Sequence, residues 1–132
     1  MQISKKKLGD IGEEKAFQYL KQQGLKLVEK NFYSRFGEID LIMLDTCHSK
    51  KLITSQTVNT NYLVFIEVRS RKNMGFGSAL ESITLAKQTK LRKTADFFFL
   101  KNKKYSKMAA RFDVFIVSST SDNDNNWIKN AF

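Results

Sequence analysis

Two short apolar segments of this chain each contain an acidic residue, and they constrain the fold more than any other feature. The segments are 37–45 (GEIDLIMLD) and 63–69 (LVFIEVR). Both are rich in Ile, Val, Leu or Phe and have polar or Gly-containing flanks, which is the pattern of buried β-strands. A carboxylate inside such a strand is costly unless it is paired or bound to a metal. Asp40 and Glu67, one in each segment, are therefore predicted to converge on one cation.

Strand geometry groups the polar residues further, because side chains two positions apart share a face. Asp40 is expected to share a face with Ile42, whereas Ile39 points the other way. Glu67 and Arg69 share a face, so a metal ligand would lie beside a cation. Phosphodiester hydrolysis needs both, a divalent ion that activates water and positive charge near the phosphorane.

The composition indicates a single domain with a polyanionic partner. A chain of 132 residues, 42% of them hydrophobic, fits one domain over residues 1–132. There are 23 Lys and Arg against 13 Asp and Glu, and the net charge of +10 favours nucleic acid or anionic lipid. With one cysteine there is no disulfide framework and no zinc knuckle. No apolar run has the length of a membrane span and no signal-peptide core is visible, so a cytoplasmic protein that does not bind membranes is expected.

A helix is predicted from about residue 8 to residue 23, ended by Gly24 as a C-cap. Glu13 falls on the apolar stripe of this helix and has two explanations. It favours the helix dipole in the first turns, or it is directed at the same site as Asp40. The full stripe, at spacings of three and four, is Glu13, Ala16, Phe17 and Leu20.

The next segments predict a hairpin. Residues 25–33 form a first strand, and the turn at 34–37 joins it to the Asp40 strand. Residues 46–61 are polar and without a clear period, which predicts a long hairpin loop. Cys47 beside His48 in that stretch could form a metal pair, but an ordinary loop thiol is the preferred interpretation.

A long helix is predicted over residues 78–100, with Lys87 on its apolar stripe between Ile83 and Leu91. A lysine there either extends its charged end to solvent or supplies a cation to the carboxylate cluster. The basic loop at 70–77 is either a simple connection or an approach to a phosphate backbone. The outward helix face is basic and suited to phosphate contacts, although most such faces are simply solvated. The residues expected to bind nucleic acid are Arg35, Arg71, Lys72, Lys90, Arg92 and Lys93.

Residues 111–117 predict another strand, and 127–132 a short edge strand or a docked tail. The order helix, strand, strand, strand, helix, strand describes an α/β domain with a mixed central sheet flanked by helices. The hairpins make part of the sheet antiparallel, and the strands on either side of the long helix form a parallel crossover.

Several motifs occur together and in order along the chain. They are GE at 12–13, NFY at 31–33, GEIDLI at 37–42, FIEVRSR at 65–71, KQ at 87–88, RFDV at 111–114 and NAF at 130–132. This combination resembles the YraN-like family of small bacterial proteins, over nearly the whole chain except 46–61 and 118–126. That family is similar to restriction-endonuclease-like nucleases, including archaeal Holliday-junction resolvases, so the resemblance implies a restriction-endonuclease-like core.

The resemblance also implies roles for individual residues. In those nucleases an Asp on one strand and an acid-x-Lys motif on the next bind magnesium, often with a helical Glu. Asp40 and Glu67 match the strand ligands of Mg²⁺ or Mn²⁺, and Glu13 matches the helical acid. Arg69 stands where that pattern has lysine; it can clamp a phosphate but cannot act as a general base. Lys87 would supply the missing ammonium if its helix packs over the site.

The expected function is a divalent-metal-dependent nuclease acting on DNA rather than RNA, with Asp40, Glu67, Arg69 and Lys87 as catalytic residues. Branched or structured DNA follows from the likeness to resolvases only, and a resolvase-like role would require a homodimer. Because of Arg69, the alternative is a non-catalytic nucleic-acid-binding module on a nuclease fold. A third interpretation is a structural protein with buried ion pairs such as Glu67–Arg69 or Asp40–Lys87.

Overall fold

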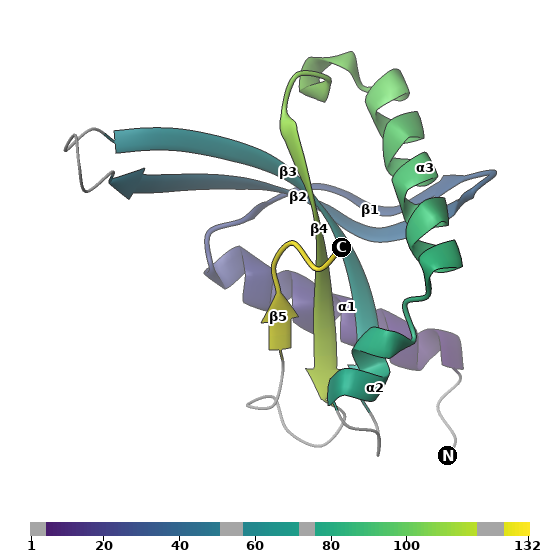
Figure 1. The fold of residues 1–132 in the computed structure, drawn as a ribbon. Coiled ribbons are helices and arrows are strands. Elements are labelled where there is room, and N and C mark those ends of the chain that lie inside the picture. The colour runs from purple at the N-terminus through teal and green to yellow at the C-terminus, as the bar shows by residue number, and fades with distance from the viewer. Residues whose placement is uncertain (1–4, 51–56, 72–75, 119–125) are drawn as a thin grey trace.

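Five strands form one mixed sheet in the order β1-β2-β3-β4-β5, with helices on both faces (Figure 1). The computed structural model describes residues 5–50, 57–71, 76–118 and 126–132. The strands β3 and β4 are parallel and the other neighbouring strands are antiparallel, so the predicted mixed sheet and crossover are confirmed. The elements are α1 (Lys5–Gln22), β1 (Lys26–Ser34), β2 (Gly37–Lys50), β3 (Thr57–Arg71), α2 (Phe76–Glu81), α3 (Leu85–Lys101), the 3-10 helix η1 (Lys103–Tyr105), β4 (Ala109–Ser118) and β5 (Asn126–Ile128). No helix in the described ranges is long and apolar enough to cross a membrane.

Each face of the sheet has its own hydrophobic core. On one face α1 packs through Ala16 and Leu20, two members of its predicted stripe. On the other face α3 packs through Leu91, Ala95 and Phe98. The sheet residues of the α1 core include Leu41, Met43, Val64, Ile66, Phe115 and Val117. Those of the α3 core include Phe32, Ile39, Ile42, Leu63, Phe65, Val114 and Ile116.

The strict alternation expected across Asp40 is wrong in one respect. Ile39 packs in the same core as Ile42, although alternation placed these two side chains on opposite faces. Leu41 and Met43 lie together in the other core, as expected. The alternation therefore changes at Asp40, where the paired part of the β2–β3 ladder ends.

The predicted loop at 46–61 is largely strand instead. Residues Thr46 to Lys50 pair with Asn61 to Thr57, and residues 51–56 lie outside the described part of the chain. The pairing of β1 with β2 stops at Leu44, and that of β3 with β4 begins at Tyr62, so β2 and β3 continue as a two-stranded arm (Figure 1). The arm is held together by backbone hydrogen bonds and does not need a row of apolar side chains. Its sequence is therefore polar and shows no alternation of apolar and polar residues. Cys47 and His48 belong to β2, and their side chains are outside the described part.

The single long helix predicted over 78–100 is in fact two helices, α2 and α3, that meet at a cap. Thr84 has extended backbone angles (φ −67°, ψ 166°), and its side chain accepts a hydrogen bond from the backbone N–H of Lys87 at 3.2 Å. A threonine in that role starts a new helix, because it satisfies an N–H that has no partner within the helix. The break lets α3 begin near Glu67 of the central strand β3, and this positions Lys87.

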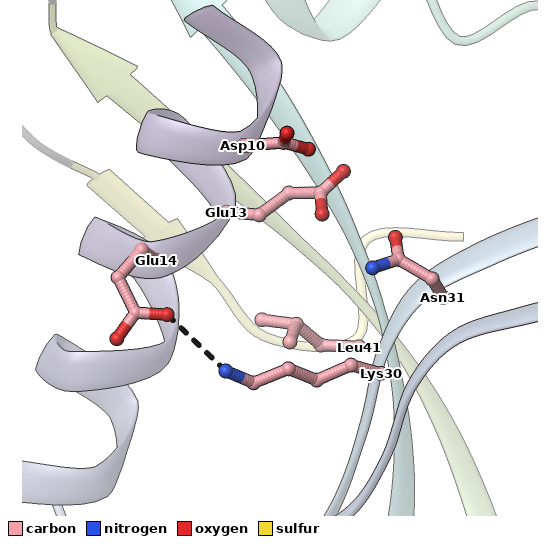
Figure 2. Close-up of a pocket in the computed structure, with 6 residues that line it drawn as sticks. All are labelled: Asp10, Glu13, Glu14, Lys30, Asn31 and Leu41. Carbon is pink, nitrogen blue, oxygen red and sulfur yellow. Dashed lines mark hydrogen bonds and ion pairs between the residues drawn. The ribbon is translucent and has the colours of Figure 1, made fainter. Parts of the chain in front are cut away.

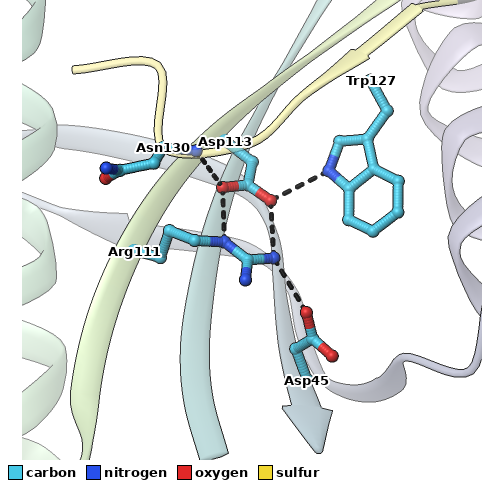
Figure 3. Close-up of polar contacts among 5 residues, drawn as sticks. All are labelled: Asp45, Arg111, Asp113, Trp127 and Asn130. Atoms are coloured by element: carbon cyan, nitrogen blue, oxygen red, sulfur yellow. Dashed lines mark hydrogen bonds and ion pairs between the residues drawn. The ribbon is translucent and has the colours of Figure 1, made fainter. Parts of the chain in front are cut away.

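A buried acid on β4 fastens the C-terminal segment to the sheet (Figure 3). Asp113 is fully buried and accepts hydrogen bonds from Arg111 Nε and Nη2, Trp127 Nε1 and the Asn130 backbone N–H, all at 2.9 Å. Arg111 also bonds Asp45 on β2 at 3.0 Å. The C-terminal residues thus form both the edge strand β5 and a docked tail, and Trp127 packs against the core on the α1 side.

Candidate active site

The strands β2 and β3 stop pairing where their acidic residues begin. The ladder includes the pair Leu41–Ile66, and beyond it a side chain takes over the hydrogen bonding. The Asp40 Oδ2 atom accepts a hydrogen bond from the backbone N–H of Val68 at 2.8 Å. This bond fixes the Asp40 carboxylate against the strand that carries Glu67.

Two glutamates, Glu13 and Glu67, are each harder to ionise because the charge of Asp40 lies near them. Burial, together with the charge of Asp40 and a hydrogen bond to it, raises the pKa of Glu13 to about 7. Burial and the charge of Asp40 likewise raise the pKa of Glu67 to about 7, although Lys87 and Arg69 act in the opposite direction. Burial also raises the pKa of Asp40, against the lowering effect of the Val68 N–H. Near neutral pH the Glu13 carboxyl can therefore hold a proton and donate it to Asp40, as two neighbouring carboxyls require.

Two cations meet the Glu67 carboxylate from different elements. Arg69 Nη2 lies 3.3 Å from Glu67 Oε1, and Lys87 Nζ at the start of α3 lies 3.7 Å from the same oxygen. Lys87 is thus directed at the cluster, with 34% of its side chain still exposed. It acts on Asp40 through its charge, and no Asp40–Lys87 ion pair is found in the described ranges.

One N–H group of the Arg69 guanidinium makes no hydrogen bond within the described part of the chain. Its Nε atom is buried and has no hydrogen-bond acceptor among the residues that the structure describes. Buried donors are rarely left unpaired, so this N–H is a candidate contact for an oxygen of a bound anion.

A pocket of about 210 Å³ adjoins the cluster on the α1 side. Glu13 and Asp10 project from α1 toward the strands, and Asn31 faces them from β1 (Figure 2). Asn31 belongs to the NFY motif, but sequence reasoning assigned it no role at the site; it has φ 52° and so lies in the left-handed region that few non-glycine residues adopt. Asparagine inside a predicted strand was the available signal, because Asn tolerates that conformation better than most residues. The pocket is lined by Asp10, Glu13, Glu14, Lys30, Asn31 and Leu41.

The residues expected to bind nucleic acid do not all lie together. Arg35 of the β1–β2 turn and Lys93 of α3 both approach the Phe36 ring. Lys90 is exposed on α3 as well. Arg92 instead lies over Phe132 of the C-terminal tail, 5.4 Å from the ring centroid. The Arg71 backbone ends β3 but its side chain is not described, and Lys72 lies outside the described ranges.

The three carboxylates fit a hard divalent cation by chemistry, because Mg²⁺ and Mn²⁺ prefer oxygen ligands. Burial is the largest cause of their raised pKa values, and the charge of Asp40 adds to it for Glu13 and Glu67, so a bound cation would favour the ionised form of these carboxyls. In the described ranges, however, no three Asp, Glu, His or Cys side chains are arranged so that they could hold a metal ion as they stand. A metal ion bound here would displace a proton from Glu13 and compete with Arg69 and Lys87 for the Glu67 carboxylate.

Comparisons with known proteins agree on one family. A family model described as uncharacterised protein family UPF0102 matches residues 12–117. The UPF0102 protein of Legionella pneumophila strain Corby is 43% identical over 124 residues, which cover 94% of this chain and 92% of the relative. That of Ectopseudomonas mendocina strain ymp is 38% identical over 125 residues, covering 95% and 93%. A relative from Enterobacter sp. strain 638 is 41% identical over 131 residues, covering 98% and 87%.

Proposed function

This chain belongs to the uncharacterised protein family UPF0102, the YraN-like family, and we propose that it is a divalent-metal-dependent nuclease acting on DNA. The observation that carries the proposal is the meeting of three carboxyls and two cations where β2 and β3 separate. Carboxyls whose pKa values are raised by burial and by a neighbouring acid weaken a fold, and such groups cluster at functional sites. We further propose that the sheet and its crossover are a restriction-endonuclease-like core.

Glu13, Asp40 and Glu67 would hold Mg²⁺ or Mn²⁺, with the Val68 N–H keeping Asp40 in place. When bound, such an ion activates water and polarises the scissile phosphate. Each ligand comes from a different element, α1, β2 or β3, so the rigid core sets the positions of all three. This agrees with the need for preorganised ligands in a catalytic site.

The two cations would contact the phosphate that is cut. Arg69 stays protonated, so its role is charge and hydrogen bonding, for which its Nε is available. Lys87 reaches the same carboxylate from α3 and is partly exposed, so it can move from Glu67 to a phosphate oxygen once Glu67 takes part in metal binding. Positive charge at that point stabilises the charge that develops in the transition state.

DNA would lie over the middle of α3 and the β1–β2 turn, where Lys90, Lys93 and Arg35 are exposed. These residues can contact backbone phosphates without reading sequence. Branched or structured DNA remains part of the proposal by likeness to resolvases, and it carries the expectation of a homodimer.

One observation favours a second candidate, a DNA-binding module without catalysis. Arg69 occupies the lysine position of the nuclease pattern and binds Glu67 directly at 3.3 Å. If that pair persists when DNA binds, the Glu67 oxygen that Arg69 contacts is not free to hold a metal ion. This candidate predicts salt-sensitive DNA binding with no cleavage.

The test is cleavage of a four-way DNA junction and of matched duplex in Mg²⁺ or Mn²⁺, using the intact protein and the variants Asp40→Asn and Glu67→Gln. Cleavage by the intact protein and loss of at least about a hundredfold in both variants is expected, because each removes a metal ligand. DNA binding without cleavage in either metal would favour the non-catalytic module.

Two lysines of α3 provide a matched comparison. Lys87→Ala is expected to reduce cleavage far more than Lys90→Ala, because only Lys87 reaches the carboxylate cluster. Equal losses from the two variants would show that Lys87 acts only as part of the basic surface.

A further inference from the structure

A second pocket lies between the β1–β2 turn and the outer face of α3, separate from the acid cluster. Its volume is about 460 Å³. The turn is held against the helix, because Ser34 Oγ bonds the Phe36 backbone N–H at 3.1 Å and Thr94 Oγ1 at 3.3 Å. The pocket is lined by Arg35, Phe36, Lys93, Asp96, Phe97 and Leu100.

This pocket combines apolar surface with positive charge. The Leu100 side chain is 72% exposed. The Arg35 guanidinium carbon is 4.8 Å from the centroid of the Phe36 ring, and Lys93 Nζ is 5.8 Å from it. Lys101 Nζ lies 5.4 Å from the ring of Phe97. Three cations over two rings would repel a cationic partner, and they suit one that brings both a flat ring and negative charge.

We infer that this pocket takes an unpaired base of a DNA strand, stacked on Phe36 between phosphates bound by Arg35 and Lys93. Both cations are exposed and have long side chains, so each can exchange the aromatic ring for a phosphate oxygen. Asp96, the acid in the lining, can accept a hydrogen bond from the amino group of a base. Aromatic rings flanked by basic side chains are the usual means of holding single-stranded nucleic acid.

The pocket is also placed to work with the acid cluster. Gly37 ends the turn and lies three residues before Asp40, a separation of about 10 Å along a strand. Lys93 lies six residues after Lys87, which is about 9 Å along a helix. At the spacing of about 3.4 Å per nucleotide in a stacked strand, the unpaired base would lie at most roughly three nucleotides from the phosphate at Lys87. A substrate with a junction, flap or single-stranded end therefore fits better than a continuous duplex, and this inference rests on the proposed function for the choice of DNA.

The test is binding of a fluorescently labelled single-stranded DNA of about 12 nucleotides, measured by anisotropy in EDTA so that no metal or cleavage is involved. Phe36→Ala is expected to weaken binding about five- to a hundredfold, which corresponds to the loss of one stacked base. Leu85→Ala, which removes an apolar side chain that is 78% exposed on the same helix, is the matched control and should change affinity less than twofold.

A further variant separates the loss of base stacking from misfolding, and two further measurements test for other partners. Phe36→Leu keeps the pocket apolar but removes the flat ring, so it should also bind DNA at least about fivefold more weakly while melting near the intact protein. Unchanged DNA affinity in Phe36→Leu would overturn the inference. So would tighter binding of an RNA of the same sequence, or loss of a dimer in Phe36→Ala at unchanged DNA affinity.

These outcomes are independent of nuclease activity. DNA binding that depends on Phe36, with no cleavage, would support the base-binding role of the pocket and favour the non-catalytic DNA-binding module. Cleavage of DNA junctions that is unaffected by Phe36→Ala would overturn the pocket and leave the proposed nuclease intact.

Discussion

Replacement of the Glu67 carboxyl by an amide is expected to stabilise the protein at alkaline pH. Burial and the neighbouring charge of Asp40 raise the pKa of Glu67 to about 7, from an ordinary value of 4.5. The folded state thus binds this proton more tightly than the unfolded chain does. The resulting contribution to stability is complete below pH 4.5 and is lost as the pH rises through about 7.

The size of that loss follows from the same two pKa values. Their difference corresponds to about 3 kcal/mol. At pH 8 Glu67 is ionised, and the unfolding free energy is therefore lower by that amount than it would be with a neutral side chain at this position. The amide of Glu67→Gln resembles the protonated carboxyl and cannot ionise. The variant should therefore match the intact protein at pH 5 to within about 1 kcal/mol and exceed it by about 3 kcal/mol at pH 8.

The assay is urea unfolding in EDTA at the two pH values, followed by the fluorescence of Trp127, the one tryptophan of the chain. Glu81→Gln, at an exposed position on α2, is the matched control and should change stability by less than about 0.5 kcal/mol. If the ion pairs of Glu67 with Arg69 and Lys87 instead stabilise the fold, Glu67→Gln would lower the unfolding free energy by about 3–5 kcal/mol at pH 8. That result would refute the reasoning and favour a structural protein.

Three more predictions follow from the described contacts. Mn²⁺ should raise the melting temperature more at pH 8 than at pH 5.5, because protons compete for Glu13 and Glu67 at the lower pH; equal shifts in a thermal melt would contradict a carboxylate site. Asp113→Ala should cost about 3–5 kcal/mol by urea unfolding followed by circular dichroism, because Arg111 loses its buried partner; a loss below about 1 kcal/mol would show that the tail is fastened otherwise. Gly24→Ala should cost about 1 kcal/mol in the same assay, because φ is +99° there; no loss would mean that the helix ends another way.

Much of the core and the position of the acids could be predicted from local sequence patterns. Apolar runs mark strands directly, and an acid inside such a run is conspicuous because it is costly to bury. Helical spacing placed Glu13 and Lys87 on inward stripes, and the structure directs both at the cluster. The sequence could not show that Lys87 pairs with Glu67 rather than Asp40, because that depends on where α3 begins.

The missed features depend on contacts between distant residues or on the backbone. The arm formed by β2 and β3 is polar, so only cross-strand pairing identifies it. The bond from Arg111 to Asp45 joins residues 66 positions apart, and no local pattern reveals it. Thr84 as a helix cap was readable in principle, but the apolar stripe of residues 78–100 appeared continuous through it. Asn31 was missed because a left-handed residue within a strand has no periodic signature.

Calorimetric titration of Mn²⁺ into the intact protein and into Asp40→Ala, at pH 8 and without DNA, tests the central claim most directly. The intact protein should bind one or two ions, and Asp40→Ala should bind at least tenfold more weakly, since Asp40 is the acid that Val68 fixes within the cluster. Lys129→Ala, which changes a distant exposed residue, should bind as the intact protein does. Absence of Mn²⁺ binding by the intact protein, or equal binding by Asp40→Ala, would contradict a metal-dependent nuclease.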